Sequence, residues 1–348
     1  MRAIVVDDVR ARPAVRERPA PPAPEGGVVV RVLATGLCRS DWHAWAGHDS
    51  DVRFPFVPGH ELAGEIAAVG AGVERWRVGQ RVTVPFVCGC GRCVWCSSGE
   101  AQVCPDQQQP GFTHDGSFAE LVALHAADTN LVAVPEEVSM PAAAALGCRF
   151  ATAYRGLVAR ARLVDDEWLV VVGAGGVGLS AVMIARALGA RVVVVDRNER
   201  ALEAARALGA EATVLGGDGV DVPAAITDLT GGGAHVSVDA VGHPQAAADA
   251  ILGLRRRGRH VQIGLLPPVD GHPRVPMSRV IGWELDLLGS HGMAARDYPE
   301  LLALVASGAL RPDLLVERTV SLDEAADLLP GFDRADVAGI TMIDPALG

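Results

Sequence analysis

The chain has 348 residues, enough for two domains that each bury a hydrophobic core. Hydrophobic residues make up 49% of it, yet its longest apolar runs, such as Trp168 to Val172, have strand length and are too short to span a bilayer. The formal net charge of -11 argues against general binding to nucleic acids or membrane surfaces. No signal-like apolar region precedes the first acidic residues, so we expect a cytoplasmic protein whose cysteines stay reduced.

The first part of the chain alternates short β-like runs with glycine and proline. Val28 to Leu33, Gly64 to Val69 and Gln80 to Val84 have this pattern. It is typical of an antiparallel, barrel-like domain, which we expect over residues 1–150.

A cysteine cluster lies within this predicted domain. Its members share the spacing C-x2-C-x2-C-x7-C and are Cys90, Cys93, Cys96 and Cys104. Two C-x2-C steps and a nearby fourth thiol can surround one ion tetrahedrally and leave no position open. The spacing therefore predicts a structural zinc ion that stabilises a lobe over residues 88–104. Cys88 lies too close to Cys90 for an alternative ligand pair, and we expect it to stay a free thiol.

After Cys148 the pattern changes to strands alternating with helices. Strand patterns recur at Trp168 to Val172, Arg191 to Val195, Val236 to Val238, His260 to Ile263 and Leu285 to Leu288. Helical patterns extend to Leu188 after the first strand and begin again near Pro244. Such alternation implies parallel strands joined by crossover helices, so we expect a doubly wound sheet over residues 151–290.

The end of the chain, residues 291–348, shows few elements. A helical pattern covers Tyr298 to Ser307, and only a short β-like segment follows it. We expect this end to pack back onto the first domain.

A glycine-rich loop, Gly-Ala-Gly-Gly-Val-Gly over residues 173–178, joins the first strand of the second domain to its helix. Gly173 permits a tight turn, Gly175 lets the backbone approach a pyrophosphate, and Gly178 allows close packing of helix on strand. The helix N-terminus, with Gly176 and Val177, offers N–H groups to the phosphates. The loop therefore predicts a dinucleotide site.

An acid at the end of the next strand, Asp196, is placed to accept hydrogen bonds from the adenosine ribose. Its charge would repel a 2′-phosphate, so the sequence favours NAD over NADP. Arg197 follows directly, belongs to the same predicted site and is the one feature that favours NADP. Asp239 ends another strand, where a role near the cofactor and simple termination of the strand are both open.

Three further segments are dense in chemically useful side chains: Cys38 to His43, Gly59 to Gly64 and Leu146 to Thr152. Together with the cysteine cluster and the glycine loop, they resemble the zinc-dependent medium-chain alcohol dehydrogenases. The likeness covers the whole chain in order. Gly111 to Phe118 and Asp41 to Trp45 look like the tetrameric yeast and bacterial branch of this family.

The resemblance implies an α/β protein in which a GroES-like, β-rich catalytic domain is joined to a doubly wound Rossmann domain that binds NAD. It also implies two zinc ions per chain, one in the cysteine cluster and one catalytic. Cys38, His60 and Cys148 would hold the catalytic ion, with one position left for water or substrate. Glu61 matches an acid that can visit this ion when that position is exchanging.

Residues beside the catalytic ion also match functional positions of the family. Asp41 matches a carboxylate that fixes the ring of His60. Ser40 matches the hydroxyl beside the zinc-bound oxygen, and His43 matches the outer end of a relay that carries the proton away. Arg39 matches a cationic partner of the cofactor pyrophosphate.

The implied reaction is reversible hydride transfer between an alcohol, held as the alkoxide on zinc, and NAD, giving an aldehyde or ketone. Trp42, Trp45 and Phe86 lie in segments that border the substrate cleft in relatives, although core positions are equally open for them. The resemblance implies a homotetramer, with a dimer as the alternative. A polyol or amino-alcohol dehydrogenase of the same superfamily, which often uses a carboxylate as third zinc ligand, and an inactive nucleotide-binding relative are the other possibilities.

Overall fold

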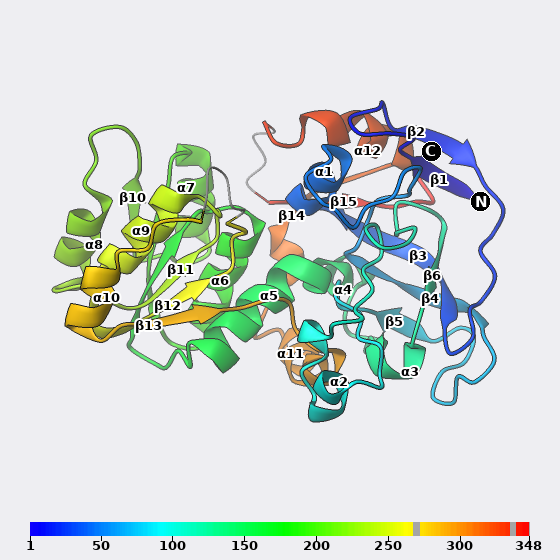
Figure 1. Cartoon of the computed structure of the whole chain (residues 1–348), viewed down its shortest axis with the longest axis horizontal. Helices are drawn as coiled ribbons and strands as arrows, with labels where there is room; N and C mark the ends of the chain where they lie inside the picture. Colours follow the sequence, from blue (N-terminus) through cyan, green and yellow to red (C-terminus); the bar gives the residue numbers. More distant parts are fainter. Residues whose placement is uncertain (267–271, 335–338, 348) are drawn as a thin grey trace. The chain divides into compact units, whose positions relative to one another are not determined.

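The computed structural model describes residues 1–266, 272–334 and 339–347. The chain forms two compact units, and Figure 1 shows their helices and strands with most of them labelled. The first unit comprises Met1–Ala151 and Gly292–Gly348, and the second comprises Thr152–His291. Within the described ranges, no helix is long and apolar enough to cross a membrane.

The first unit is built on a mixed sheet with the strand order β14-β15-β3-β4-β5-β7, and β6 pairs with β3. The strands of this sheet are β3 (Val28–Leu37), β4 (Leu62–Val69), β5 (Arg81–Thr83), β6 (Leu121–Leu124), β7 (Val132–Ala133), β14 (Val316–Val320) and β15 (Ile340–Ile343). The first unit also contains a separate two-stranded sheet of β1 (Arg2–Val5) and β2 (Ala14–Glu17). β3 is central because alternate side chains, Val28, Val30 and Val32, are buried in one hydrophobic core. β15 pairs with β3, so the end of the chain contributes a strand to this sheet.

The helices of the first unit are α1 (Arg39–Trp45), α2 (Val94–Ser98), α3 (Ala127–Asn130), α4 (Met140–Ala145), α11 (Tyr298–Ala306) and α12 (Leu322–Leu328). The expectation of only one helix and a short β-like segment at the end of the chain was wrong, because the structure adds α12 and β14. The start of α12 is defined by a capping box between Ser321 and Glu324, and the helix buries Leu322 and Ala325.

The second unit contains a parallel sheet with the strand order β10-β9-β8-β11-β12-β13 among its described residues. The strands are β8 (Trp168–Val172), β9 (Arg191–Asp196), β10 (Ala212–Leu215), β11 (Ala234–Asp239), β12 (Leu254–Gln262) and β13 (Asp286–Gly289). The α-helices are α6 (Gly176–Ala187), α7 (Glu199–Ala207), α8 (Val222–Thr230), α9 (Pro244–Leu252) and α10 (Met277–Trp283). A further helix, α5 (Ala151–Arg155), spans the boundary between Ala151 of the first unit and Thr152 of the second. The strand order reverses between β8 and β11, so the predicted doubly wound sheet is confirmed, with its switch point at the ends of these strands.

Candidate active site

The end of β3 and the start of α1 position the first group of polar side chains. Cys38 is the N-cap of α1, and the carboxylate of Asp41, fully buried, accepts a hydrogen bond from the backbone N–H of Cys38 at 2.9 Å. The other oxygen of Asp41 accepts the N–H of Gly59 at 3.0 Å and lies 2.9 Å from Nδ1 of His60. One buried carboxylate thus joins the helix to the segment that carries the histidine.

The ring of His60 is oriented by this contact. Its Nδ1–H donates to Asp41, while its Nε2 is buried and has no hydrogen-bond partner in the part of the chain that the structure describes. Burial lowers the pKa of His60, but the carboxylate of Asp41 and the sulfur of Cys38 more than offset this, so the pKa lies well above its usual value. The surroundings therefore favour a positive charge at the ring, which a metal ion bound to Nε2 would supply.

Cys148 comes to the same place from a π-helical turn, Leu146–Phe150, that follows α4. Single π turns occur often at functional sites. A hydrogen bond from the Cys148 thiol lowers the pKa of Cys38 well below its usual value, burial opposes this, and the guanidinium of Arg149 lowers it further. The sharing of one proton between the two sulfurs raises the pKa of Cys148.

The ligand atoms of Cys38, His60, Glu61 and Cys148 all lie within 4.8 Å of one another. Two sulfurs and an imidazole nitrogen whose lone pair has no other partner are the donors that zinc prefers. The residues therefore fit a zinc ion held by three protein ligands.

Glu61 differs from the other three because it is paired with a cation. Its carboxylate, fully buried, accepts the backbone N–H of Arg149 at 3.1 Å and the Nε–H at 2.9 Å, and it also contacts Nη2. Burial raises the pKa of Glu61, and Arg149 opposes the shift. A Cβ at Gly36 would collide with this pair, so glycine leaves the space that the pair occupies.

Ser40 and His43 lie three positions apart on α1 and so share one face of the helix. Sγ of Cys38 lies 3.8 Å from Oγ of Ser40. His43 is partly buried, and its Nδ1 lies 2.9 Å from Nδ1 of His48. Arg39 is exposed and donates to the backbone oxygen of Asp333 at 3.1 Å.

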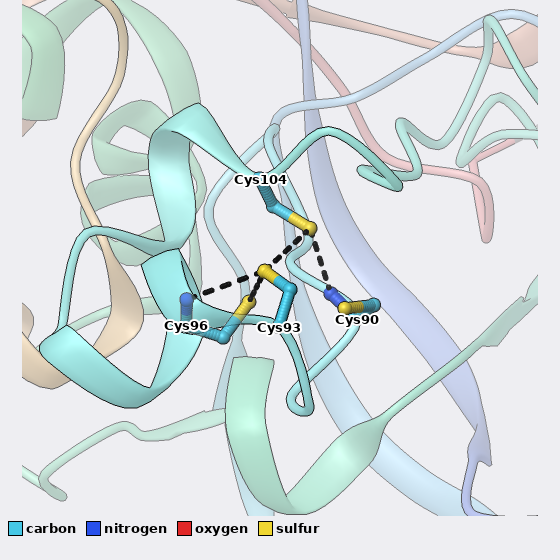
Figure 2. Close-up of side chains that lie close together, drawn as sticks. All are labelled: Cys90, Cys93, Cys96 and Cys104. Atoms are coloured by element: carbon cyan, nitrogen blue, oxygen red, sulfur yellow. Dashed lines mark hydrogen bonds between the residues drawn. The ribbon is translucent and has the colours of Figure 1, made fainter.

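The cysteine cluster of the sequence forms a second, separate site around α2, which has Cys93 as its N-cap. Figure 2 shows the sulfur atoms pointing toward one another, with 3.5 Å between Cys93 and Cys96 and 3.7 Å between Cys93 and Cys104. Tetrahedral zinc with Zn–S bonds of about 2.3 Å places its sulfurs roughly 3.8 Å apart. Burial raises the pKa of Cys96 to about 12, whereas the backbone N–H of Arg92 lowers that of Cys90 to about 6. Four thiolates can therefore coexist here only around a cation, and the set fits a closed zinc site.

Cys88 lies outside this cluster. It is 3% exposed, packs in the core beneath the sheet of the first unit, and donates to the backbone oxygen of Pro85 at 3.5 Å. Burial raises the pKa of its thiol to about 12, so the thiol is inert at neutral pH.

The glycine loop of the second unit connects β8 to α6. Gly173 has φ +99°, and a Cβ there would meet Val241, while a Cβ at Gly178 would collide with the backbone of Gly173. Gly175, the N-cap of α6, faces open space with nothing within 4 Å of a built Cβ. Two glycines thus serve packing, and the middle one leaves room for a ligand beside the N–H groups of Gly176 and Val177.

Two acidic side chains accept backbone hydrogen bonds, one from this loop and one from the turn beside it. Asp196 accepts the N–H of Ala174 at 2.6 Å and that of Asn198 at 2.9 Å, while Arg197 beside it is exposed. Asp239, fully buried, accepts the N–H groups of residues 241 and 242 at 2.8 and 3.1 Å and a hydrogen bond from Gln262 at 2.7 Å. Asp239 therefore fixes the turn that packs against Gly173.

Comparison with known proteins assigns the chain to a family. A model described as the alcohol dehydrogenase GroES-like domain matches residues 24–136, and one described as zinc-binding dehydrogenase matches residues 176–307. An alcohol dehydrogenase of Geobacillus stearothermophilus is 34% identical over 331 residues, which cover 94% of this chain and 95% of the relative. The chain belongs to the zinc-dependent medium-chain alcohol dehydrogenase family.

Two other matches show the breadth of this dehydrogenase family. An acryloyl-coenzyme A reductase of Metallosphaera sedula is 33% identical over 326 residues, which cover 93% of this chain and 94% of the relative. A solved structure described as an NAD-dependent alcohol dehydrogenase has a TM-score of 0.89 at 30% identity and covers 100% of both chains. The predicted combination of a GroES-like domain and a Rossmann domain is thereby confirmed.

Aromatic side chains lie beside the candidate metal ligands. Phe86 and Phe112 meet the ring of His60 edge-on, with centroids 6.2 and 5.3 Å away. The indole N–H of Trp42 is buried and has no hydrogen-bond partner among the described residues, whereas Trp45 lies in the core and donates to the backbone oxygen of Ala11 at 2.7 Å.

Sequence reasoning missed Arg149, Phe112 and the link between His43 and His48. An arginine directly after a predicted zinc ligand was a usable signal for the first, because a buried cation needs an acidic partner. The position of Phe112 beside His60 had no local signal.

Proposed function

We propose that the chain is a zinc- and NAD-dependent alcohol dehydrogenase that interconverts a small alcohol and the corresponding aldehyde or ketone. The observation that carries the proposal is the buried, unpartnered Nε2 of His60 beside the sulfurs of Cys38 and Cys148. Bound zinc would act as a Lewis acid on the alcohol oxygen, and NAD would accept the hydride. The structural cluster would hold the second zinc of the chain.

The residues of the first unit support this chemistry in distinct ways. Asp41 holds the ring of His60 so that Nε2 stays available for metal. Ser40, next to Cys38, would take the proton from the alcohol, and His43 would pass it on. Because Glu61 is tied to Arg149, it leaves the fourth metal position to substrate.

The second unit supports a nicotinamide dinucleotide. The open space at Gly175 admits the pyrophosphate, and Asp196 favours the unphosphorylated ribose of NAD. Arg39 of α1 stays a candidate partner of the pyrophosphate, and Arg197 stays the residue that favours NADP. The homotetramer and the cytoplasmic location expected from the sequence stay predictions as well.

The alternatives explain fewer of these features. A polyol or amino-alcohol dehydrogenase would favour a carboxylate as third ligand, whereas Cys148 supplies a thiolate and Glu61 is occupied by Arg149. A relative without activity would have no need of the hydroxyl of Ser40 and the imidazole of His43.

The test is turnover by zinc-loaded protein with NAD and a panel of primary, secondary, aromatic and polyhydric alcohols, monitored by NADH absorbance. Acryloyl-coenzyme A with NADH or NADPH forms a separate arm. We expect an alcohol to be oxidised and the reverse reaction to occur with its carbonyl product. Absence of turnover with every alcohol and every aldehyde would reject the proposal, and turnover in the acryloyl-coenzyme A arm alone would replace it.

The Cys148→Ser variant tests the metal assignment. It should lose about 100-fold or more in turnover while one of the two zinc ions is lost, as zinc analysis of the purified protein would show. Cys88→Ala is the control, because it also removes a thiol of the first unit, but one that is buried in the core and lies outside both clusters. It should keep both zinc ions and its turnover. Two zinc ions in active Cys148→Ser protein would contradict the assignment.

A further inference from the structure

The turn after α1 brings a second histidine back onto the first. Ala46 is the C-cap of α1, and Gly47 follows with φ +77°. The N–H of His48 donates to the carbonyl of His43 at 3.0 Å, and the N–H of Gly47 donates to that of Ala44 at 3.2 Å. These two bonds form a Schellman motif, in which the residue two positions after the cap packs on the residue three positions before it.

At this motif the usual apolar contact is replaced by a hydrogen bond between two imidazoles. Nδ1 of His43 and Nδ1 of His48 are 2.9 Å apart, and the ring centroids are 5.2 Å apart. The ring of Trp42 meets both edge-on, at 5.0 and 5.3 Å, which restricts their motion. Because one nitrogen must donate and the other accept, a proton lies directly between the rings.

The two histidines differ in their access to water. His48 is exposed, whereas His43 is partly buried. Burial lowers the pKa of His43, and the nearby His48 and Arg39 lower it further. The other charged groups that act on His43 are Cys38 and Asp49, which raise its pKa but do not offset these effects. The turn Leu329–Gly331 packs against α1 and carries no titratable side chain, and beyond it Asp333 accepts a hydrogen bond from Arg39 through its backbone oxygen and pairs with Arg334 at 3.8 Å. The protonated form of His43 is therefore disfavoured, and a proton that reaches its ring must pass to another acceptor.

We propose that His48 is the last residue of the proton relay: it accepts a proton from His43 and releases a proton to water. The proposal rests on the proposed function, because alcohol oxidation supplies the proton. A proton arrives at Nε2 of His43, the proton on its Nδ1 passes to Nδ1 of His48, and the proton on Nε2 of His48 leaves to water. One proton enters and one leaves, and the reverse order supplies the proton for reduction of a carbonyl.

The variant His48→Gln removes the acceptor ring and keeps the backbone bonds of the Schellman motif. In the zinc-loaded enzyme with NAD, single-turnover proton release, followed with a pH indicator in dilute buffer, should slow roughly 3- to 10-fold, less than the 10²- to 10⁴-fold expected for loss of a primary acid or base. Added imidazole should restore the rate, because an external base replaces the missing one. The double variant His43→Gln/His48→Gln should be no slower than His43→Gln, since the two act in series. His125→Gln, which alters a histidine in ring contact with His114, is the control and should match the unaltered enzyme.

A second measurement is independent of turnover. Titration of the imidazole resonances of the zinc-loaded protein by NMR should show a higher pKa for His43 in His48→Gln, because the repulsion from His48 is removed. Unchanged proton release, a loss that imidazole does not restore, additive effects in the double variant, or an unchanged titration of His43 would each overturn the proposal. Absence of turnover in the unaltered protein, with the coupled titration intact, would instead reject the proposed function and leave the coupled pair in place.

Discussion

The ion pair between Glu61 and Arg149 is the most consequential single contact that the structure adds to the predicted ligands. Both side chains are nearly inaccessible to water, at 0% and 7% exposure. Removing one partner of such a pair leaves an uncompensated buried charge, which costs about 3–5 kcal/mol. We therefore expect Arg149→Met to lose roughly this much unfolding free energy, measured by chemical denaturation of the zinc-loaded protein.

The double variant Glu61→Gln/Arg149→Met leaves no unpaired charge and should recover a large part of the loss. Arg257→Met is the matched control, because Arg257 and Glu284 form a pair of which both members are more than two-thirds exposed. Its cost should stay below about 1 kcal/mol. Equal destabilisation in Arg149→Met and Arg257→Met would show that the buried pair has no special energetic role.

At the scale of single elements, the glycine loop before α6 assigns different tasks to its glycines. A side chain at Gly175 would enter open space, and the backbone there, φ -79° and ψ -167°, suits any residue. Gly175→Val should therefore keep the thermal stability of the protein and weaken NAD binding by about 10-fold or more, since the side chain occupies the space of the pyrophosphate. Fluorescence titration with NAD and a melting curve measure the two effects.

Gly178→Ala is the contrasting variant of the same loop. Its Cβ would collide with the backbone of Gly173, so it should lower the melting temperature even without NAD. If Gly175→Val melts early, or if it binds NAD normally, the division of tasks within the loop is wrong.

The elements and residues that sequence reasoning could predict share a local signal. The cysteine spacing, the glycine loop and the alternation of strands and helices each lie within a short window, and the resemblance supplied the candidate ligands of a catalytic metal. The pairing of Glu61 with Arg149 joins residues 88 positions apart, so it depends on tertiary structure that no window contains. α12 and the link between His43 and His48 had local signals, a capping box and a glycine after a helix end, that were not used.

At the scale of the whole molecule, the two units have separate hydrophobic cores and separate candidate ligands, zinc in the first and NAD in the second. A ligand stabilises the part that binds it by mass action. Cys96→Ser, which opens the four-sulfur site, should therefore lower protection against hydrogen exchange in the first unit, most strongly around residues 88–104, while the second unit keeps its protection. Bound NAD should instead raise protection against hydrogen exchange in the second unit, around Gly173.

The expected size of the Cys96→Ser effect follows from the role of its metal. Structural zinc contributes directly to folding, so we expect a loss of about 3 kcal/mol or more, which lowers the melting temperature by roughly 6–12 °C. Cys88→Ala should leave exchange in the lobe unchanged, because Cys88 belongs to the core and not to the cluster. An equal loss of protection in both units would mean that they unfold as one cooperative body. A selective loss would mean that the zinc lobe stabilises its own unit and that the nucleotide-binding unit folds on its own core.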